Sequence, residues 1–264
     1  MTSELIKKPP IVSPLRQDTP VLLVLLGASN LSRGCFTFSK HMKECLHPRS
    51  TEVLIASGPG RAYYASGGML NVTYPPIYIN NIFEVAQSKF ESGYQVVALA
   101  TDIGNDIMYG VSVEQLIETV RQIFERLQSM NAEIFYTTLP VTFEKKDHLI
   151  RFRILRSLLF PHSAITYDEA VAGIIEVNRF LRECRYGHLI SDMNQYLGFD
   201  AIHYGWLRAH AAWSQVAKAM LGTLGVTMTH EITLAGMVRS YWEEFRQVVG
   251  SDMMGFKKNN PEHF

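Results

Sequence analysis

The residues VLLVLLGASNLSRG, Val21–Gly34, predict the centre of the fold. They begin with six consecutive aliphatic residues, a run expected of a strand buried on both faces of a parallel sheet. Gly27 ends this strand, a small polar turn occupies residues 28–30, and residues 32–46 have the pattern of a helix. Open α/β sheets bind ligands at the carboxyl ends of their strands. Ser29 lies at such an end, near a helix N-terminus that stabilises negative charge, and is therefore a candidate nucleophile.

A serine at this position need not be catalytic. Ser29 or Ser32 could simply cap the helix. A nucleotide-binding loop requires G-x-G-x-x-G or G-x-x-x-x-G-K-[ST], and the stretch contains neither pattern. The G-x-S-x-G turn of α/β-hydrolases is absent from it too. The interpretation of Ser29 as a nucleophile therefore depends on residues elsewhere in the chain.

Composition limits the partners of the protein. The 264 residues are enough for one large domain, and 25 basic residues balance 25 acidic ones. This balance gives no electrostatic reason to expect nucleic acid, and no apolar run reaches the roughly 18 residues of a membrane span. The residues before Val21 do not fit a signal peptide, because prolines and charges interrupt them. The three cysteines form no C-x-x-C pair, so we expect reduced thiols and a cytoplasmic location.

The pattern divides the chain into a polar, proline-bearing arm over residues 1–19, a main domain over 20–225, and a helical extension and tail over 226–264. Residues 230–249 have the period of an amphipathic helix. Its apolar stripe consists of Leu234, Val238, Tyr241, Phe245 and Val248. We interpret this stripe as core packing, with a lid or a homo-oligomer contact between copies of the chain as the alternative.

Strand and helix patterns alternate along the main domain. Strands are predicted over residues 21–26, 51–56, 95–100, 133–139 and 188–192. Helices are predicted over residues 32–46, 78–90, 113–130, 148–160, 168–185 and 207–224. Such alternation predicts an α/β fold, a five-stranded parallel sheet with helices on both faces.

Four short polar segments follow the predicted strands. They are Gly27–Asn30, Gly58–Arg61, Gly104–Asp106 and Asp200–His203. If the strand order brings these segments together, they supply the parts of an acyl-transfer site. Ser29 needs a base within hydrogen-bond reach, and His203 has a suitable unperturbed pKa. Asp200, three residues before His203, can accept the Nδ1–H of the imidazole and fix its tautomer.

A tetrahedral intermediate also needs hydrogen-bond donors that are already in place. The backbone N–H groups of Ser29 and Gly60 and the side-chain amide of Asn105 can supply three. We interpret Asp102 and Asp106, which flank Asn105, as residues that shape the loop rather than as an acid/base pair.

The four segments resemble, in order, the sequence blocks of the SGNH or GDSL-type hydrolases. The resemblance covers roughly residues 20–225 and implies a three-layer α/β/α flavodoxin-like sandwich, a serine esterase or lipase activity, and no cofactor. The first block departs from the family because Ala28 replaces its usual aspartate, and the second departs because it contains Pro59.

The resemblance also implies roles for individual residues. The family's nucleophile falls on Ser29, its Asp-x-x-His pair on Asp200 and His203, and its oxyanion-hole asparagine on Asn105. Its oxyanion glycine falls on Gly60, which we prefer, or on Gly58.

The surroundings of the site are less clearly specified. Tyr63 and Tyr64 begin an aromatic, glycine-rich segment over residues 62–78 that either faces a ligand or packs on itself. Arg61 either meets an anionic group of the substrate or caps a nearby carbonyl or carboxylate. No H-E-x-x-H motif and no Cys/His cluster with zinc spacing occurs, so we expect no metal.

The sequence thus predicts a serine ester hydrolase that acts on a small acyl ester, such as a lipid, a thioester or an acetylated sugar. An acyltransferase with the same acyl-enzyme, or an inactive binding or scaffold protein that keeps the fold, is the alternative.

Overall fold

The computed structural model describes residues 18–68, 72–139, 147–254 and Phe264. Five parallel strands form one sheet in the order β2-β1-β3-β4-β5. The strands are β1 (Val21–Leu26), β2 (Thr51–Ala56), β3 (Gln95–Ala100), β4 (Glu133–Thr137) and β5 (His188–Ile190). This order is that of flavodoxin-like sheets, so the chain has the expected α/β three-layer fold.

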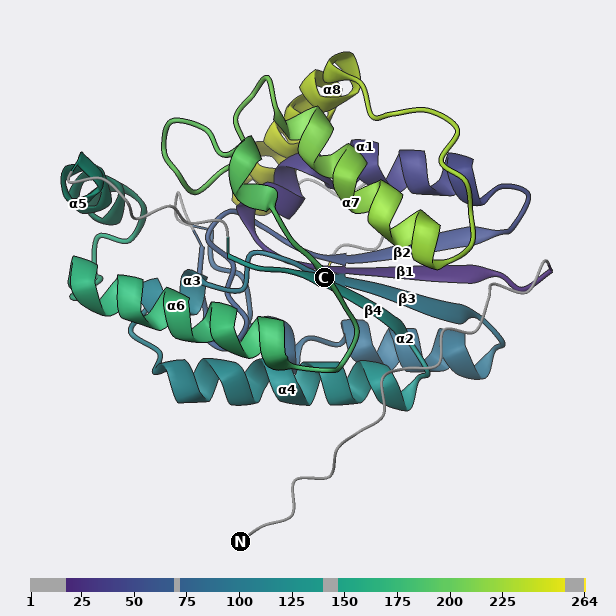
Figure 1. Ribbon diagram of the computed structural model, residues 1–264, viewed down its shortest axis with the longest axis horizontal. Coiled ribbons are helices and arrows are strands. Elements are labelled where there is room, and N and C mark those ends of the chain that lie inside the picture. Colours follow the sequence, from purple (N-terminus) through teal and green to yellow (C-terminus); the bar gives the residue numbers. More distant parts are fainter. Residues whose placement is uncertain (1–17, 69–71, 140–146, 255–263) are drawn as a thin grey trace, which may run out of the picture.

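Helices cover both faces of the sheet (Figure 1). On one side lie α1 (Ser29–Leu46) and α7 (Ala209–Thr223), and α8 (Leu234–Arg246) packs against α1. On the other side lie α2 (Ile82–Glu91), α4 (Val113–Ser129) and α6 (Tyr167–Glu183). The remaining helical segments are α3 (Asn105–Met108), α5 (Asp147–Leu159), η1 (Ile77–Ile79), η2 (Met193–Tyr196) and η3 (Gln247–Met253).

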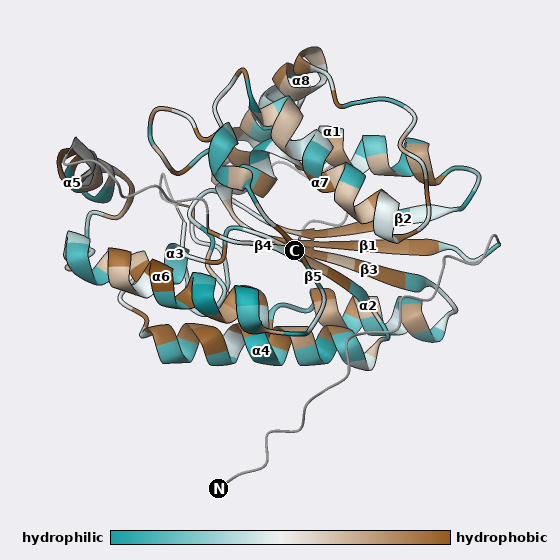
Figure 2. Cartoon of the chain, viewed as in Figure 1, coloured by the Kyte–Doolittle hydropathy of each residue, from teal (hydrophilic) through white to brown (hydrophobic). Residues whose placement is uncertain are grey.

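Strand β1 separates two apolar cores. All six of its residues are fully buried, and they alternate between the two sides of the sheet. Leu23 and Leu25 pack with α1 and α7, whereas Leu22 and Val24 pack with α2 and α4. Figure 2 shows the strands as the hydrophobic layer between amphipathic helices. This double burial explains why β1 is an unbroken aliphatic run.

The strand order also locates a crevice for ligands. The chain passes from β1 outward to β2 and then back across β1 to β3. In open α/β sheets the ligand crevice lies at the carboxyl ends of the two strands on either side of such a reversal. Ser29 and Asn105 come directly after the turns that follow β1 and β3, as the first residues of α1 and α3.

Most predicted elements are confirmed, with shifted ends. Helix α1 begins at Ser29 rather than at residue 32, because Asp102, from the loop after β3, accepts hydrogen bonds from its first N–H groups. The helix predicted over residues 78–90 is instead η1 followed by α2. The two are separated at Asn80, whose side chain accepts a hydrogen bond from the N–H of Ile82.

The interpretation of α8 as packing through its apolar stripe is wrong for most of that stripe, although Tyr241 packs partly buried against the core. Leu234, Val238 and Phe245 are 40%, 58% and 55% exposed, whereas Met237 and Ser240 are fully buried. The Ser240 hydroxyl accepts a hydrogen bond from a backbone N–H of α1, so a polar residue lies at the centre of this contact. Whether the exposed stripe contacts another copy of the chain stays a prediction.

Two other expectations concern the ends and the surroundings of the chain. Residues 1–17 of the predicted arm lie outside the described residues. The division into parts over residues 20–225 and 226–264 stays a prediction. Across the described part of the chain, every helix is too short or too polar to span a lipid bilayer.

The packing of α7 on α1 generates a test of the core. A Cβ added at Gly34 of α1 would lie 2.2 Å from Nε1 of the buried Trp213. Alanine normally stabilises a helix by about 1 kcal/mol relative to glycine. We nevertheless expect Gly34→Ala to lower the free energy of unfolding by about 1–3 kcal/mol through overpacking, measured by urea denaturation. Gly222→Ala is the matched control, because no atom lies within 4 Å of that added Cβ; an equal loss in both variants would contradict the packing argument.

Candidate active site

Ser29, His203 and Asp200 form a continuous chain of hydrogen bonds. The Ser29 Oγ lies 2.8 Å from His203 Nε2, and His203 Nδ1 lies 2.6 Å from Asp200 Oδ2. Ser29 is the first residue of α1, and the other two come from one distant loop, with His203 174 positions after Ser29. The imidazole is largely buried, with 11% of its side chain exposed. The structure therefore brings together the three residues predicted as nucleophile, base and orienting acid.

The loop that contains Asp200 and His203 is held tightly. Leu197 and Tyr204 form an antiparallel bridge across its neck. Asp200 Oδ1 accepts hydrogen bonds from the N–H groups of Ile202 and His203 at 3.1 and 2.9 Å. Ala201 has a φ of 57°, a left-handed conformation that alanine rarely adopts and that surrounding contacts must maintain. Asp200 thus fixes the backbone of the loop with one oxygen and the imidazole with the other.

The ionisation of Asp200 suits this role. Burial alone would raise the pKa of this carboxyl group. Its hydrogen bond and charge interaction with His203, together with two backbone N–H groups, outweigh burial and lower the pKa to about 2. Asp200 is therefore ionised at neutral pH, and its carboxylate accepts a hydrogen bond from the Nδ1–H of His203.

The start of α1 is held by Asp102, from the loop after β3. Asp102 Oδ2 accepts hydrogen bonds from the N–H groups of Ala28, Asn30 and Leu31 at 3.0, 3.1 and 3.2 Å. A helix leaves its first N–H groups without intrahelical partners, so this carboxylate caps α1 from a distant loop. It bonds the N–H groups on both sides of Ser29 but not that of Ser29 itself.

Asn30 connects this turn to the histidine loop. Its side chain donates to Asp102 Oδ1 at 2.9 Å and to the Ile202 carbonyl at 3.3 Å. Its Oδ1 accepts from the N–H of Tyr204 at 2.9 Å. These contacts lie on either side of His203, so Asn30 ties the position of the imidazole to that of Ser29. This role could not be found from the sequence, because nothing local to Asn30 indicates its partners.

Gly58–Arg61 forms a β-turn closed by a 3.1 Å hydrogen bond from the Arg61 N–H to the Gly58 carbonyl. Pro59 precedes Gly60, whose φ is 75°, as a type II turn requires. Asn105 Nδ2 donates to the Arg61 carbonyl at 2.8 Å, which joins this turn to the loop after β3. Gly60 and Asn105, two of the predicted oxyanion donors, are thus linked through Arg61, the residue that follows Gly60.

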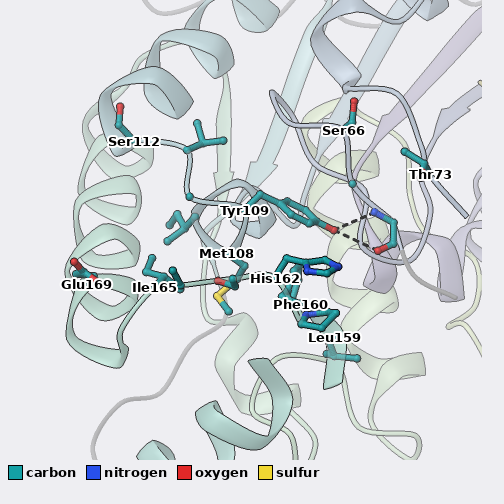
Figure 3. Close-up of a pocket in the computed structure, with 18 of the residues that line it drawn as sticks. Ser66, Thr73, Met108, Tyr109, Ser112, Leu159, Phe160, His162, Ile165 and Glu169 are labelled. Atoms are coloured by element: carbon teal, nitrogen blue, oxygen red, sulfur yellow. Dashed lines mark hydrogen bonds between the residues drawn. The ribbon is translucent and has the colours of Figure 1, made fainter. Parts of the chain in front are cut away.

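Tyr109 holds the same turn from the other side. Its hydroxyl donates to the Gly60 carbonyl at 2.7 Å and accepts from the Gly68 N–H at 3.0 Å. Figure 3 shows this hydroxyl directed at the backbone of the glycine-rich loop. Within the described residues, the N–H groups of Ser29 and Gly60 donate to no other protein group. Ser29 is partly exposed, and Gly60 is buried.

Asp106 shapes the loop, as expected. Its carboxylate is fully buried and accepts hydrogen bonds from the N–H groups of Tyr63, Tyr64 and Ala65 at 2.8–2.9 Å. Burial raises its pKa, and these three N–H groups partly oppose the increase. Both carboxylate oxygens of Asp106 accept hydrogen bonds from backbone N–H groups, which supports a structural role rather than one in acid/base catalysis.

The three residues proposed around the substrate have different positions. Arg61 is 1% exposed, and its guanidinium donates to the main-chain oxygen of Phe264. Tyr63 is also 1% exposed, and its hydroxyl contacts the carbonyls of Leu26 and Thr101. Tyr64 reaches the surface, at 36% exposure, and stacks on Tyr78.

A cavity of about 1040 Å³ lies beside Tyr109 (Figure 3). It is bounded by residues 66–68 and 72–73, by residues 107–113, and by residues 159–165 with Glu169. Its apolar lining includes Ile107, Met108, Val113, Phe160 and Ile165. Tyr109 packs edge-on against Phe160, so one residue borders the cavity and holds the Gly60 turn.

The extension after residue 225 also reaches the site. Glu244 of α8 is half-buried, and burial raises its pKa. The charge of Arg33, the Ser32 hydroxyl and the charge of His203 oppose this increase, so the carboxyl group lies near all three. No sequence pattern indicates this residue, because α8 packs through a face that its apolar stripe does not mark.

A substitution at Asp102 tests whether its carboxylate holds the turn before α1 in place. Asp102→Asn replaces one acceptor oxygen by an N–H donor that faces other donors. We expect it to lower the free energy of unfolding by about 2 kcal/mol or more, measured by urea denaturation. Asp192→Asn is the matched control, because Asp192 also has a positive φ but is exposed. Wild-type stability in Asp102→Asn would show that the carboxylate does not hold the turn.

Neither a family model nor a curated protein sequence matches the chain. Solved structures do match, among them an acetyl xylan esterase with 14% identity and a TM-score of 0.49, covering 75% of this chain and 99% of that one. A psychrotrophic esterase from Pseudoalteromonas sp. has 10% identity and a TM-score of 0.44, covering 77% and 98%. A GDSL-like lipase from Bacteroides thetaiotaomicron has 9% identity and a TM-score of 0.43, covering 79% and 92%.

These likenesses are too distant to carry an argument about activity. Many of the solved structures that match this chain are nevertheless SGNH or GDSL-type hydrolases, esterases and acylhydrolases, the family that its four polar segments resemble.

Proposed function

We propose that the protein is a serine ester hydrolase of the SGNH type that acts through a covalent acyl-enzyme on Ser29. The observation that carries this proposal is the hydrogen-bonded chain from Ser29 Oγ through His203 to Asp200. A serine hydroxyl is a weak nucleophile unless a base can take its proton as it attacks. Here the base is within reach and its tautomer is fixed by an ionised carboxylate.

The proposed reaction has two acyl transfers. His203 Nε2 removes the proton of the Ser29 hydroxyl while Oγ forms a bond to the ester carbonyl carbon. His203 then gives that proton to the alkoxy oxygen as the bond between this oxygen and the carbonyl carbon breaks. Water repeats the sequence against the acyl-enzyme, which releases the acid and regenerates Ser29.

The negative charge of each tetrahedral intermediate requires donors. We assign this role to the N–H groups of Ser29 and Gly60 and to the side-chain amide of Asn105. One N–H of that amide can bond the Arg61 carbonyl while the other is directed to the oxyanion. We prefer Gly60 to Gly58, because Tyr109 holds the Gly60 carbonyl and Asn105 bonds the carbonyl of the next residue, Arg61.

The cavity beside Tyr109 is proposed to receive the larger group of the substrate. Its apolar lining favours an acyl chain or another apolar group over a charged one. A panel of p-nitrophenyl esters of graded chain length, with a sugar acetate and an acyl thioester, distinguishes lipid, acetylated-sugar and thioester substrates. Adding an alcohol acceptor and measuring the transfer product separates a hydrolase from a transferase.

The first test replaces the nucleophile. We expect Ser29→Ala to abolish hydrolysis of p-nitrophenyl acetate and covalent labelling by a fluorophosphonate, because no acyl-enzyme can form. Ser39→Ala is the matched control on the same helix, because its buried hydroxyl lacks a hydrogen-bond partner among the described residues. Activity retained in Ser29→Ala would point to another nucleophile, and wild-type protein that neither hydrolyses esters nor labels would favour a binding protein.

A second test concerns Asn105. Because the oxyanion exists only in the transition state and the intermediates, loss of its donor lowers kcat more than it weakens substrate binding. We expect Asn105→Ala to lower kcat by about 100- to 1,000-fold with little change in KM. Steady-state kinetics measure both values, and circular dichroism confirms that the variant is folded. An unchanged kcat would remove Asn105 from the proposed oxyanion hole.

A further inference from the structure

A second group of chemically reactive side chains lies at the opposite end of α1. His41, Glu44 and Cys45 occupy the last two turns of the helix, about 18 Å or more along its axis from Ser29. Spacings of three and four residues place them on one helix face. His230, from the segment that leads into α8, completes the group. We call these four residues the α1 terminal cluster.

The donor atoms of His41, Glu44 and His230 lie close together, and Cys45 joins the group through its contact with His41. One ligand atom from each of His41, Glu44 and His230 lies within 4.8 Å of the others. His41 Nε2 lies 3.6 Å from Cys45 Sγ, and His230 Nε2 lies 3.5 Å from Glu44 Oε2. The two imidazole rings meet edge to face, with centroids 4.8 Å apart.

These separations have the lengths that a metal ion imposes. Zinc bonds of about 2.1 Å to nitrogen and 2.3 Å to sulfur place two such donors about 3.6 Å apart in a tetrahedral site. Nitrogen and oxygen donors come about 3.4 Å apart in the same geometry. The His41–Cys45 and Glu44–His230 separations match these two values.

We propose that His41, Glu44, Cys45 and His230 bind a divalent metal ion, with zinc the ion that this donor set selects. Imidazole and thiolate ligands suit zinc, whereas magnesium and calcium prefer oxygen ligands. On binding, the Cys45 thiol releases its proton to water, and the ion replaces the contact between His41 and Cys45. Small rotations of Glu44 and His230, both about half exposed, bring the remaining donors to bonding distance.

Neighbouring side chains orient two of the proposed ligands, His230 and Glu44. The Thr229 hydroxyl contacts His230 Nδ1 at 2.9 Å, which directs Nε2 toward Glu44. Lys40 pairs with the other oxygen of Glu44 and leaves Oε2 to the ion.

The bound ion would join α1 to the segment before α8. That segment continues into the helix that places Glu244 beside His203. The site is therefore structural and separate from the proposed chemistry. It could not be found from the sequence, because three donors lie within one helix and the fourth lies far away along the chain.

The test uses the full chain after treatment with a chelator and gel filtration. Cobalt(II) is added first, because a tetrahedral site produces visible absorption bands and a thiolate ligand adds a charge-transfer band in the near ultraviolet. Zinc is then titrated against the cobalt signal. We expect one ion per chain, replacement of cobalt by zinc, and a rise in Tm of about 5 °C or more at a 100-fold excess over Kd.

Variants decide which residues bind. We expect Cys45→Ser to lose the charge-transfer band, and His230→Ala to weaken zinc binding at least 10-fold and to lose the Tm rise. Cys184→Ser and His162→Ala are the matched controls, because these residues lie outside the cluster, and both should bind as the wild type does. No cobalt signal and no Tm change in the wild type would overturn the proposal, as would binding that persists unchanged in Cys45→Ser and His230→Ala, which would show an adventitious ion only.

Discussion

The carboxylate of Asp102 is the interaction on which the proposed active site depends. It belongs to the loop after β3 but accepts the N–H groups that surround Ser29 at the start of α1. A helix normally finds such a cap in its own preceding residue, and here the preceding residue is Ala28, which has no polar side chain. The cap therefore comes from the loop after β3, the strand that pairs with β1. It holds two loops together and does not bond the N–H of Ser29.

The other contacts of the site extend from this one. Asn30 uses the same carboxylate as an acceptor and reaches the backbone on both sides of His203. Asn105, three residues after Asp102, reaches the Gly60 turn through the Arg61 carbonyl. Three loops that are distant in the chain are thus fixed relative to Ser29, largely by side chains that take no part in the proposed reaction. Such supporting contacts are what keep reacting groups within catalytic geometry.

The sequence predicted the sheet well and the supporting contacts poorly. The limits of β1, β2 and β3 agree with prediction because each strand is a buried run ended by a turn residue. Ser29, Asp200 and His203 could be assigned because their chemistry follows from residue type and from a position at a strand end. The caps provided by Asp102 and Asp106 could not, because a carboxylate can accept N–H groups from any loop that the fold brings near.

The error in α8 has a different physical cause. A helical period shows which face is apolar but not which face is buried, and the two differ when polar residues make the contact. Ser240 and Thr37 bond across the α1–α8 interface through hydroxyl and backbone groups, so this interface does not need the apolar stripe. Arg61 shows the same limit, because an arginine next to a proposed oxyanion donor can be buried against a main-chain oxygen.

Two carboxyl groups lie near His203, and their environments separate their roles. Asp200 bonds Nδ1 directly and has its pKa lowered to about 2, so it carries a full negative charge at neutral pH. Burial raises the pKa of Glu244, and the charge of His203 opposes this increase less than the charge of Arg33 and the Ser32 hydroxyl do. Groups whose pKa values are pushed apart in this way can occupy one site without competing. The orientation of His203 is therefore set by Asp200, which bonds both its imidazole and its backbone N–H.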